Sequence, residues 1–220
     1  MADIFDLFKK IESAPASKNG QVAWLIVGLG NPGAEYARTR HNVGFDAIDA
    51  LAASIGVKID RAKYHALIGE GVIDGQRVIL MKPQTYMNAS GDAIRAAADF
   101  YKIPPENILG LVDDIYQDAG RMRVRLDGSH GGHNGLKSIE SHIGAKYPRI
   151  RFGVGQKPSP QYDLAAWVLG SMPKDDIQKL ASCFPLVRDA AEKIFSGKAD
   201  AAMGLCNGHR PPDGSTEKDK

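Results

Sequence analysis

The sequence predicts an α/β protein: a single domain in which helices flank a mixed central β-sheet. Three observations support this class. Strand-like apolar runs alternate along the chain with segments whose apolar residues recur at helical spacing. The pair Asp74-Gly75 separates two strand-like runs and suits a tight hairpin, so part of the sheet must be antiparallel. The 220 residues, 43% of them hydrophobic, suffice for one core, and nothing forces a second domain.

The individual elements follow from these patterns in chain order. A buried strand is expected at residues 22–29, and a helix from about residue 43 up to Gly56. Residues 64–73 and 77–81 form the hairpin strands. Beyond them the patterns predict helices at 93–101 and 136–143, strands at 108–113, 121–126 and 149–154, and a helical C-terminal region interrupted by Pro173 and Pro185.

The two ends of the chain differ in composition from the region between them. Residues 1–20 lack the long apolar core of a signal peptide and finish in the linker-like stretch APASKNG, so they are expected to be an N-terminal extension. Residues 209–220 are expected to be a disordered tail, which leaves residues 21–208 as the single folded domain. No stretch approaches the roughly 18 apolar residues of a membrane helix, so we expect a cytoplasmic protein without a membrane partner.

Cysteine content and net charge exclude further classes. Cys183 and Cys206 stand far apart without a metal-binding spacing, which indicates a reducing compartment and no disulfide framework. The 28 basic and 26 acidic residues give a net charge of only +2. A surface that binds a polyanion must therefore arise from local clustering of charge.

The stretch GLGNPG at residues 28–33 has the spelling of a dinucleotide-binding turn. In that fold the helix starts within the glycine motif, and an acidic residue follows about 20 residues later. Here the helical pattern begins only near residue 43, and Ala52, Ala53 and Ser54 occupy the acidic position. The pattern thus favours a sharp glycine turn after the first strand over a nucleotide loop, which argues against an oxidoreductase.

Polar side chains gather where the predicted strands end. Because ligands of α/β sheets bind at the carboxyl ends of the strands, these residues predict one site. They are Asn31, Tyr36, Arg40, His41 and Asn42 after the first strand, Gln84, Tyr86 and Asn88 after the hairpin, Asp113 and Asp114, and the glycine-rich loop 127–135 with Asn134.

Four stretches at this predicted site, VGLGNPGAEYARTRHNVGF, KPQTYMNASG, HGGHNGLKSI and RIRFGVG, resemble the bacterial peptidyl-tRNA hydrolases, in order and over residues 22 to about 208. The resemblance implies a monomeric α/β enzyme that hydrolyses the ester between a peptide and the 3′ end of tRNA without a metal or other cofactor. It would bind the acceptor stem, the 3′ end and the nascent peptide, and recycle tRNA from stalled translation. The alternative is a non-catalytic RNA-binding relative of the same fold, as in plant organellar splicing factors.

Ester hydrolysis at neutral pH needs a base, and histidine is the side chain whose ordinary pKa lies nearest. His41 is the candidate general base, and Asp113 is suited to fix its tautomer and stabilise the imidazolium. Taken alone, the position of His41 favours a residue that caps the helix starting near residue 43. It is the resemblance that assigns catalytic roles to His41 and Asp113.

Water is the expected nucleophile, because no serine or cysteine lies in a nucleophile elbow. A metal is the other way to activate water, and His130, His133, His142 and Asp113 supply suitable ligand types. However, His130 and His133 lie in a glycine loop rather than at helical spacing. We therefore expect no metal, and a loop that lets backbone approach a substrate instead.

The resemblance also assigns substrate contacts. Asn31 and Asn134 match peptide-contacting positions, Tyr86 and Asn88 match further substrate contacts, and Tyr36 matches a tRNA contact. Loop asparagines are often only turn residues, yet their uncharged amides suit a peptide backbone or an ester carbonyl. A free α-ammonium would be poorly solvated among them, which fits the preference of this family for N-blocked substrates.

Basic residues follow in the second half of the chain. Arg121, Arg123 and Arg125 alternate on one predicted strand and so share a face, and Lys137, Lys146, Arg149, Arg151 and Lys157 lie nearby. An ordinary solvated face explains them equally well. We expect phosphate contacts from Arg121, Arg123, Arg125, Lys137 and Arg151, with binding that weakens steeply with salt.

Three residues depart from the family pattern. Val112 stands where many relatives carry histidine, Asp114 replaces a usual glutamate, and Gln161 occupies a position that is often a lysine holding the tRNA 5′ phosphate. These departures bear on the tRNA clamp more than on His41 and Asp113.

Overall fold

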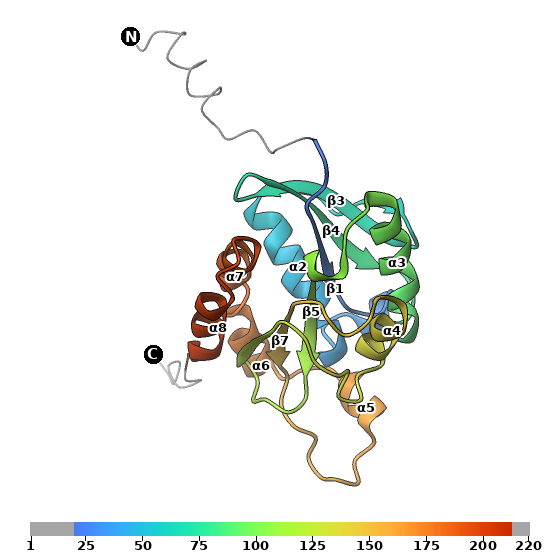
Figure 1. The fold of residues 1–220 in the computed structure, drawn as a ribbon. Coiled ribbons are helices and arrows are strands. Elements are labelled where there is room, and N and C mark those ends of the chain that lie inside the picture. Colours follow the sequence, from blue (N-terminus) through green and yellow to red (C-terminus); the bar gives the residue numbers. More distant parts are fainter. Residues whose placement is uncertain (1–19, 213–220) are drawn as a thin grey trace, which may run out of the picture.

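A seven-stranded mixed sheet forms the centre of the structure, a computed structural model that describes residues 20–212 (Figure 1). The strand order is β2-β3-β4-β1-β5-β7-β6, with β4, β1, β5 and β7 parallel and the other strands antiparallel to their neighbours. The strands are β1 (Trp24–Gly28), β2 (Arg61–Lys63), β3 (Ala66–Ile73), β4 (Gln76–Pro83), β5 (Ile108–Asp114), β6 (Met122–Arg125) and β7 (Arg149–Gly153). The expected mixed sheet is confirmed.

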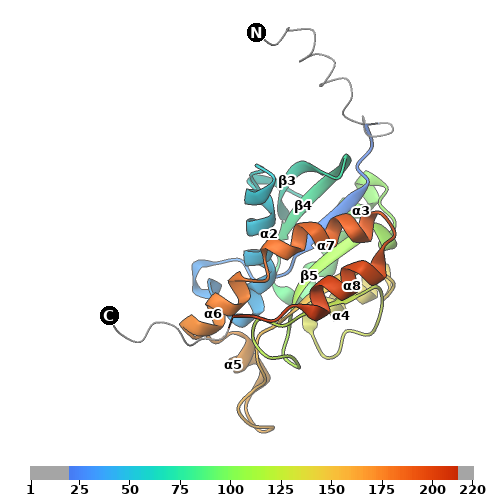
Figure 2. The same ribbon diagram turned by 90° about the vertical axis from the view of Figure 1, so that its left-hand side faces the viewer.

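Helices cover both faces of this sheet. Helices α2 (Val43–Ser54), α7 (Pro185–Phe195) and α8 (Ala199–Gly208) lie against one face, and α3 (Ser90–Tyr101) and α4 (Asn134–Ile143) against the other (Figures 1 and 2). Each face buries its own apolar cluster. The remaining helical segments are α5 (Leu164–Val168), α6 (Lys174–Ala181) and the short turns η1 (Ala34–Tyr36), η2 (Arg40–Asn42), η3 (Met87–Ala89) and η4 (Pro105–Asn107).

Most expected elements are confirmed, and three differ for physical reasons. Strand β2 was not predicted, because its three residues are all exposed and carry no apolar alternation. Helix α3 begins at Ser90, before the apolar pattern that predicted it. Helix α4 begins at Asn134, before the expected residue 136. The interruptions expected at Pro173 and Pro185 are confirmed: Pro173 is the N-cap of α6 and Pro185 the first residue of α7, positions that need no backbone N–H.

The expected N-terminal extension lies outside the described residues, apart from Gly20, and so does the expected disordered tail beyond residue 212. Within residues 20–212, no helix combines the length and apolar character that a bilayer crossing requires. Cys183 and Cys206 are both buried free thiols.

Glycines at the end of β1 allow this strand and α2 to meet backbone to backbone. A Cβ at Gly28 would overlap the carbonyl oxygen of Gly44 in the first turn of α2. Neither Gly28 nor Gly30 has a positive φ, so the expected sharp exit from the strand does not explain these two glycines. At Gly28 the requirement for glycine comes from close packing. Helix α2 begins only after η1 and η2, not within the motif, as expected of a loop that does not bind a nucleotide.

Candidate active site

A pocket of about 400 Å³ opens at the carboxyl ends of β1, β4 and β5. Strands β4 and β5 lie on opposite sides of β1 in the sheet, and ligands of α/β sheets bind at such a point. Four loops, one strand and one helix form its walls. The lining residues are Asn31 and His41 after β1, Tyr86, Met87 and Asn88 after β4, Asp113, Ile115 and Tyr116 at the end of β5, residues 131–134 before α4, Arg151 on β7, and Leu164, Ala165, Val168 and Leu169 on and just after α5.

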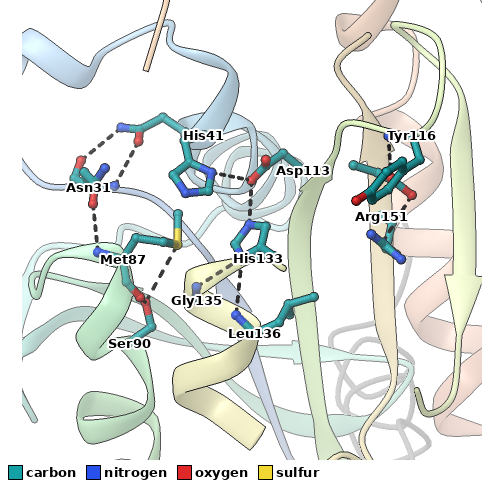
Figure 3. A network of polar contacts seen from close by, with 12 residues as sticks. Asn31, His41, Met87, Ser90, Asp113, Tyr116, His133, Gly135, Leu136 and Arg151 are labelled. Carbon is teal, nitrogen blue, oxygen red and sulfur yellow. Dashed lines mark hydrogen bonds and ion pairs between the residues drawn. The ribbon is translucent and has the colours of Figure 1, made fainter. Parts of the chain in front are cut away.

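Two histidines converge on one carboxylate in this pocket (Figure 3). Nδ1 of His41 lies 2.9 Å from Oδ1 of Asp113, and Nε2 of His133 lies 2.8 Å from the same oxygen. His41 sits in η2, Asp113 at the end of β5, and His133 at the N-cap of α4. The ring centroids of the two histidines are 4.7 Å apart. His41 does not cap α2, so the catalytic rather than the capping interpretation fits its contacts.

The hydrogen bonds assign a tautomer to each histidine. Nδ1 of His133 accepts the backbone N–H groups of Gly135 and Leu136, at 3.1 and 3.2 Å, so this nitrogen carries no proton. Nε2 of His133 must then be the N–H that donates to Asp113. Nδ1 of His41 also donates to Asp113, which leaves Nε2 of neutral His41 with a free lone pair. His41 is thereby set up as a base.

Burial and charge act in opposite directions on this pair. Burial alone would raise the pKa of Asp113, but the two histidines outweigh it and hold the pKa well below its ordinary value. Burial lowers the pKa of His41, and the charge and hydrogen bond of Asp113 outweigh that effect and raise it above 6.5. Asp113 is therefore ionised, and His41 is a stronger base than an ordinary histidine.

Asn31 is fixed by three hydrogen bonds, and the one made by its side-chain oxygen leaves the amide nitrogen free. Its backbone N–H donates to Oδ1 of Asn42 (2.8 Å), and its backbone carbonyl accepts from Nδ2 of Asn42 (3.0 Å). Its side-chain oxygen accepts the N–H of Met87 at 2.8 Å (Figure 3). Within residues 20–212 its Nδ2 has no partner, so Asn31 offers a donor to the pocket.

The other expected substrate contacts also lie at this pocket. Tyr86, Asn88 and Asn134 line it and are exposed, Tyr86 with 61% of its surface accessible. Tyr36 does not line the pocket but packs edge-on against Tyr86, with ring centroids 6.4 Å apart. Gly131 and Gly132 also line it, both with positive φ, as expected of a loop that brings backbone close to a substrate.

The histidines considered as metal ligands separate into two groups. His142 bonds to Asp92, and His130 accepts the N–H of Gly132, so neither joins Asp113. His41, Asp113 and His133 do gather ligand atoms within 4.8 Å. Yet each histidine nitrogen lies at hydrogen-bond distance from the Asp113 oxygen, whereas tetrahedral ligands about 2.1 Å from a zinc ion lie about 3.4 Å apart. This donor set fits a hydrogen-bonded triad better than a metal site.

The basic residues form two cross-strand pairs on one face of β6 and β7. Arg123 lies opposite Arg151, and Arg125 opposite Arg149, while Met122 and Val124 point into the core. Arg149 is buried with its guanidinium over the ring of Tyr147, so it is not available to phosphate. The exposed members of the expected set are Arg125 and, on α4, Lys137.

Two other basic residues are bonded within the chain. Nη1 of Arg121 donates to the carbonyl of His209 at 2.9 Å. Nζ of Lys157 donates to the carbonyls of Pro160 and Tyr162, at 2.6 and 3.1 Å. Their contribution to a phosphate-binding surface is reduced accordingly.

The departures from the family pattern have structural counterparts. Asp114 is buried, accepts from the N–H of Tyr116 and from Gln117, and lies 3.2 Å from Nε of Arg151. It thus shapes the loop after β5 and neutralises one arginine of the basic face. Val112 is fully buried in the core, and Gln161 is exposed in the segment before α5.

Sequence reasoning missed two parts of the site. His133 was considered only as a metal ligand, although a side-chain acceptor directly before a helix is the signal of an N-cap. The wall formed by Leu164, Ala165, Val168 and Leu169 was also missed. It has no local signal, because only tertiary packing brings α5 to the pocket.

Comparison with known proteins shows the family of this chain. Residues 25–214 match the family model described as peptidyl-tRNA hydrolase. The chain is 48% identical over 188 residues to the peptidyl-tRNA hydrolase of Clostridium novyi, covering 85% of this chain and 99% of that protein. It is 48% identical over 186 residues to that of Lachnospira eligens, covering 84% of this chain and 100% of that protein.

A solved structure shows the same architecture. The crystal structure of peptidyl-tRNA hydrolase from Acinetobacter baumannii superposes with a TM-score of 0.82 at 38% sequence identity. The match covers 86% of this chain and 97% of that one.

Proposed function

The chain belongs to the peptidyl-tRNA hydrolase family and hydrolyses peptidyl-tRNA, and we propose that His41 is the general base of this reaction with Asp113 as its orienting carboxylate. The observation that carries the proposal is the hydrogen bond from Nδ1 of His41 to the ionised Asp113. It leaves Nε2 of a buried histidine without a proton at a pocket large enough for the end of a peptide.

In the proposed mechanism, Nε2 of His41 takes a proton from a water molecule as the water oxygen attacks the ester carbonyl carbon. The tetrahedral intermediate collapses, the bond to the ribose 3′ oxygen breaks, and that oxygen receives the proton from His41. Asp113 stabilises the imidazolium in between. His133 is held neutral, because its Nδ1 caps α4, and so it does not repel the charge on His41.

Asn31 supports recognition of the peptide. Its free Nδ2 is a neutral donor that suits a peptide carbonyl or the developing oxyanion, and Asn88 and Asn134 line the same pocket. Tyr86 adds an exposed aromatic surface beside them. Among residues 20–212, the pocket offers no surface carboxylate to a free α-ammonium, since Asp113 is buried between two histidines, which supports a preference for N-blocked substrates.

In this proposal the phosphates of the acceptor stem are bound by basic side chains, namely Arg123, Arg125, Lys137 and Arg151. Tyr36, which packs against Tyr86, contacts the RNA. Arg121 and Arg151 contribute less, because the guanidinium of Arg121 is bonded to His209 and that of Arg151 is paired with Asp114. The enzyme acts as a monomer in the cytoplasm and recycles tRNA from stalled translation. The geometry of the basic face supports the proposed phosphate contacts, and the activity of the family supports the proposed role in recycling tRNA.

We expect the purified protein to release tRNA from N-acetyl-aminoacyl-tRNA at the same rate with and without EDTA, because the reaction needs no metal. Deacylation is measured as the loss of the radiolabelled N-acetyl-amino acid from precipitable tRNA. An intact ester after incubation with wild type, together with retained tRNA binding, would instead identify the non-catalytic RNA-binding alternative. Activity that EDTA abolishes and zinc restores would contradict the metal-independent mechanism.

Replacing Arg125 or Lys137 with alanine should raise KM, with kcat nearly unchanged. The slope of log KM against log salt should fall by about 1 for each phosphate that the variant no longer neutralises. Arg188→Ala is the matched control, because Arg188 is an exposed arginine on α7 that pairs with Glu192 away from this face. KM is measured over a range of salt concentrations. Variants whose salt slope equals that of wild type would show that these residues do not bind phosphate.

A further inference from the structure

Arg40 is a buried charged residue that the mechanism above does not use. It is 5% exposed and immediately precedes His41 in η2. Its Nη1 donates to the carbonyls of Trp167, Gly170 and Ser171, at 3.3, 3.2 and 3.2 Å. The central carbon of its guanidinium lies 3.5 Å from the centroid of the Trp167 ring. No carboxylate forms an ion pair with Arg40 in the described part of the chain, so these carbonyls and this ring are its direct partners, with the charge of Asp176 acting from farther away.

Arg40 contacts the C-terminal end of α5, a helix that has little stability of its own. Helix α5 has five residues, fewer than an isolated helix needs, and only Val168 within it is buried. Oδ1 of Asp163 caps its N-terminus by accepting the N–H of Ala166 at 2.7 Å. Arg40 serves the other end, where the carbonyl groups of a helix carry partial negative charge. Helix α5 is therefore held at its two ends, and also through the indole N–H of Trp167, which donates to the carbonyl of Gly155 at 3.1 Å.

The same helix forms one wall of the active-site pocket. Leu164, Ala165, Val168 and Leu169 face the pocket, whereas Trp167 points to Arg40. In Figure 1, α5 lies at the lower edge of the molecule, below α4. The backbone strengthens the link, because the N–H of Arg40 donates to the carbonyl of Gly170 and Thr39 forms a β-bridge with Ser171.

We propose that Arg40 is a positioning residue that fixes α5, through Trp167 and the carbonyls after it, in register with the turn that carries His41. The turn η2 then sets two walls of the pocket at once: His41 on one side and the apolar face of α5 on the other. The inference rests on the proposed function, because it takes this pocket to be where the peptidyl end binds. Loss of Arg40 is predicted to affect substrate binding rather than proton transfer.

The kinetic test uses Arg40→Met, Trp167→Leu, the double variant and Trp167→Phe, assayed on N-acetyl-aminoacyl-tRNA. Without the stacked pair, KM should rise on the order of tenfold, with kcat changed less than about threefold. The double variant should match the single variants rather than multiply them, since the two residues act through each other. Trp167→Phe keeps an aromatic face and should stay close to wild type. Arg188→Ala controls for removal of an arginine.

A spectroscopic test is independent of activity. Trp24 and Trp167 are the two tryptophans, and in a Trp24→Phe background Trp167 reports alone. Arg40→Met should shift its emission to longer wavelength and increase its quenching by acrylamide, because the ring is no longer covered by the guanidinium. If Arg40→Met does not fold, Arg40→Lys, which keeps the charge but not the planar stacking, should show the same shift.

The outcomes separate the inference from the proposed function. Folded Arg40→Met and Trp167→Leu variants with wild-type KM, or an unchanged emission of Trp167 without Arg40, would overturn the positioning role. Effects on KM that multiply in the double variant would also overturn it. A wild type that leaves the ester intact would instead overturn the function, while the emission of Trp167 would still decide whether Arg40 holds α5.

Discussion

Replacing His41 with alanine should lower kcat for peptidyl-tRNA on the order of 10²- to 10⁴-fold, because the variant removes the base proposed to take the proton from water. KM should change little, since His41 contributes to proton transfer rather than to the grip on the substrate. The rate is measured in single turnover with N-acetyl-aminoacyl-tRNA, and thermal unfolding confirms that the variant is folded.

The chain provides a matched control for this variant. His142 also bonds to a carboxylate, with Nε2 at 2.8 Å from Asp92, but it does not line the active-site pocket. His142→Ala should keep kcat within about threefold of wild type. A His41→Ala variant as active as His142→Ala would remove His41 from the mechanism.

Replacing Asp113 with asparagine should also reduce kcat on the order of 10²- to 10⁴-fold, although the side chain keeps its size. An amide can donate to Nδ1 of His41, which would favour the tautomer with a proton on Nε2, and that tautomer cannot act as a base. The variant also removes the charge that stabilises the imidazolium. The measurement is again single-turnover kcat, with Asp92→Asn as the matched control at the second histidine–carboxylate pair.

An effect confined to KM would contradict this role of Asp113. It would mean that the carboxylate shapes the pocket without acting on His41. A decrease in thermal stability alone, with kcat unchanged, would lead to the same conclusion, because Asp113 also holds the N-cap residue of α4.

The proximity of His41 and Asp113 could be predicted from sequence, because Asp113 ends one predicted strand and His41 lies in the loop that follows another, whereas their proposed catalytic roles came from the family resemblance. Strands β1 and β5 are neighbours in the sheet, so the residues that follow them meet at one edge. The amide of Asn31 was predicted in the same way. Its orientation was not, because the bond to the N–H of Met87 comes from a segment that follows another strand.

The rest of the site depends on contacts without a local pattern. The sequence predicted a helix from residue 136, so the role of His133 at the start of α4 was hidden by a boundary that lies at Asn134. The stacking of Arg40 on Trp167 joins the turn η2 to helix α5, which are far apart in the sequence, and no periodicity indicates such a pair. Arg149 was grouped with surface cations because sequence alternation does not reveal that its side chain lies buried over Tyr147.

The most direct test of the catalytic account is the dependence of kcat on pH for wild type and Asp113→Asn. His41 must be unprotonated to act, and Asp113 holds its pKa above the ordinary 6.5, so wild-type kcat should rise with pH and level off only above that value. Without the carboxylate, burial is left as the main influence and lowers the pKa of His41, so the remaining activity should level off at a lower pH. A wild-type kcat that is constant between about pH 5 and about pH 8, or an acid limb at the same pH in both proteins, would contradict the account.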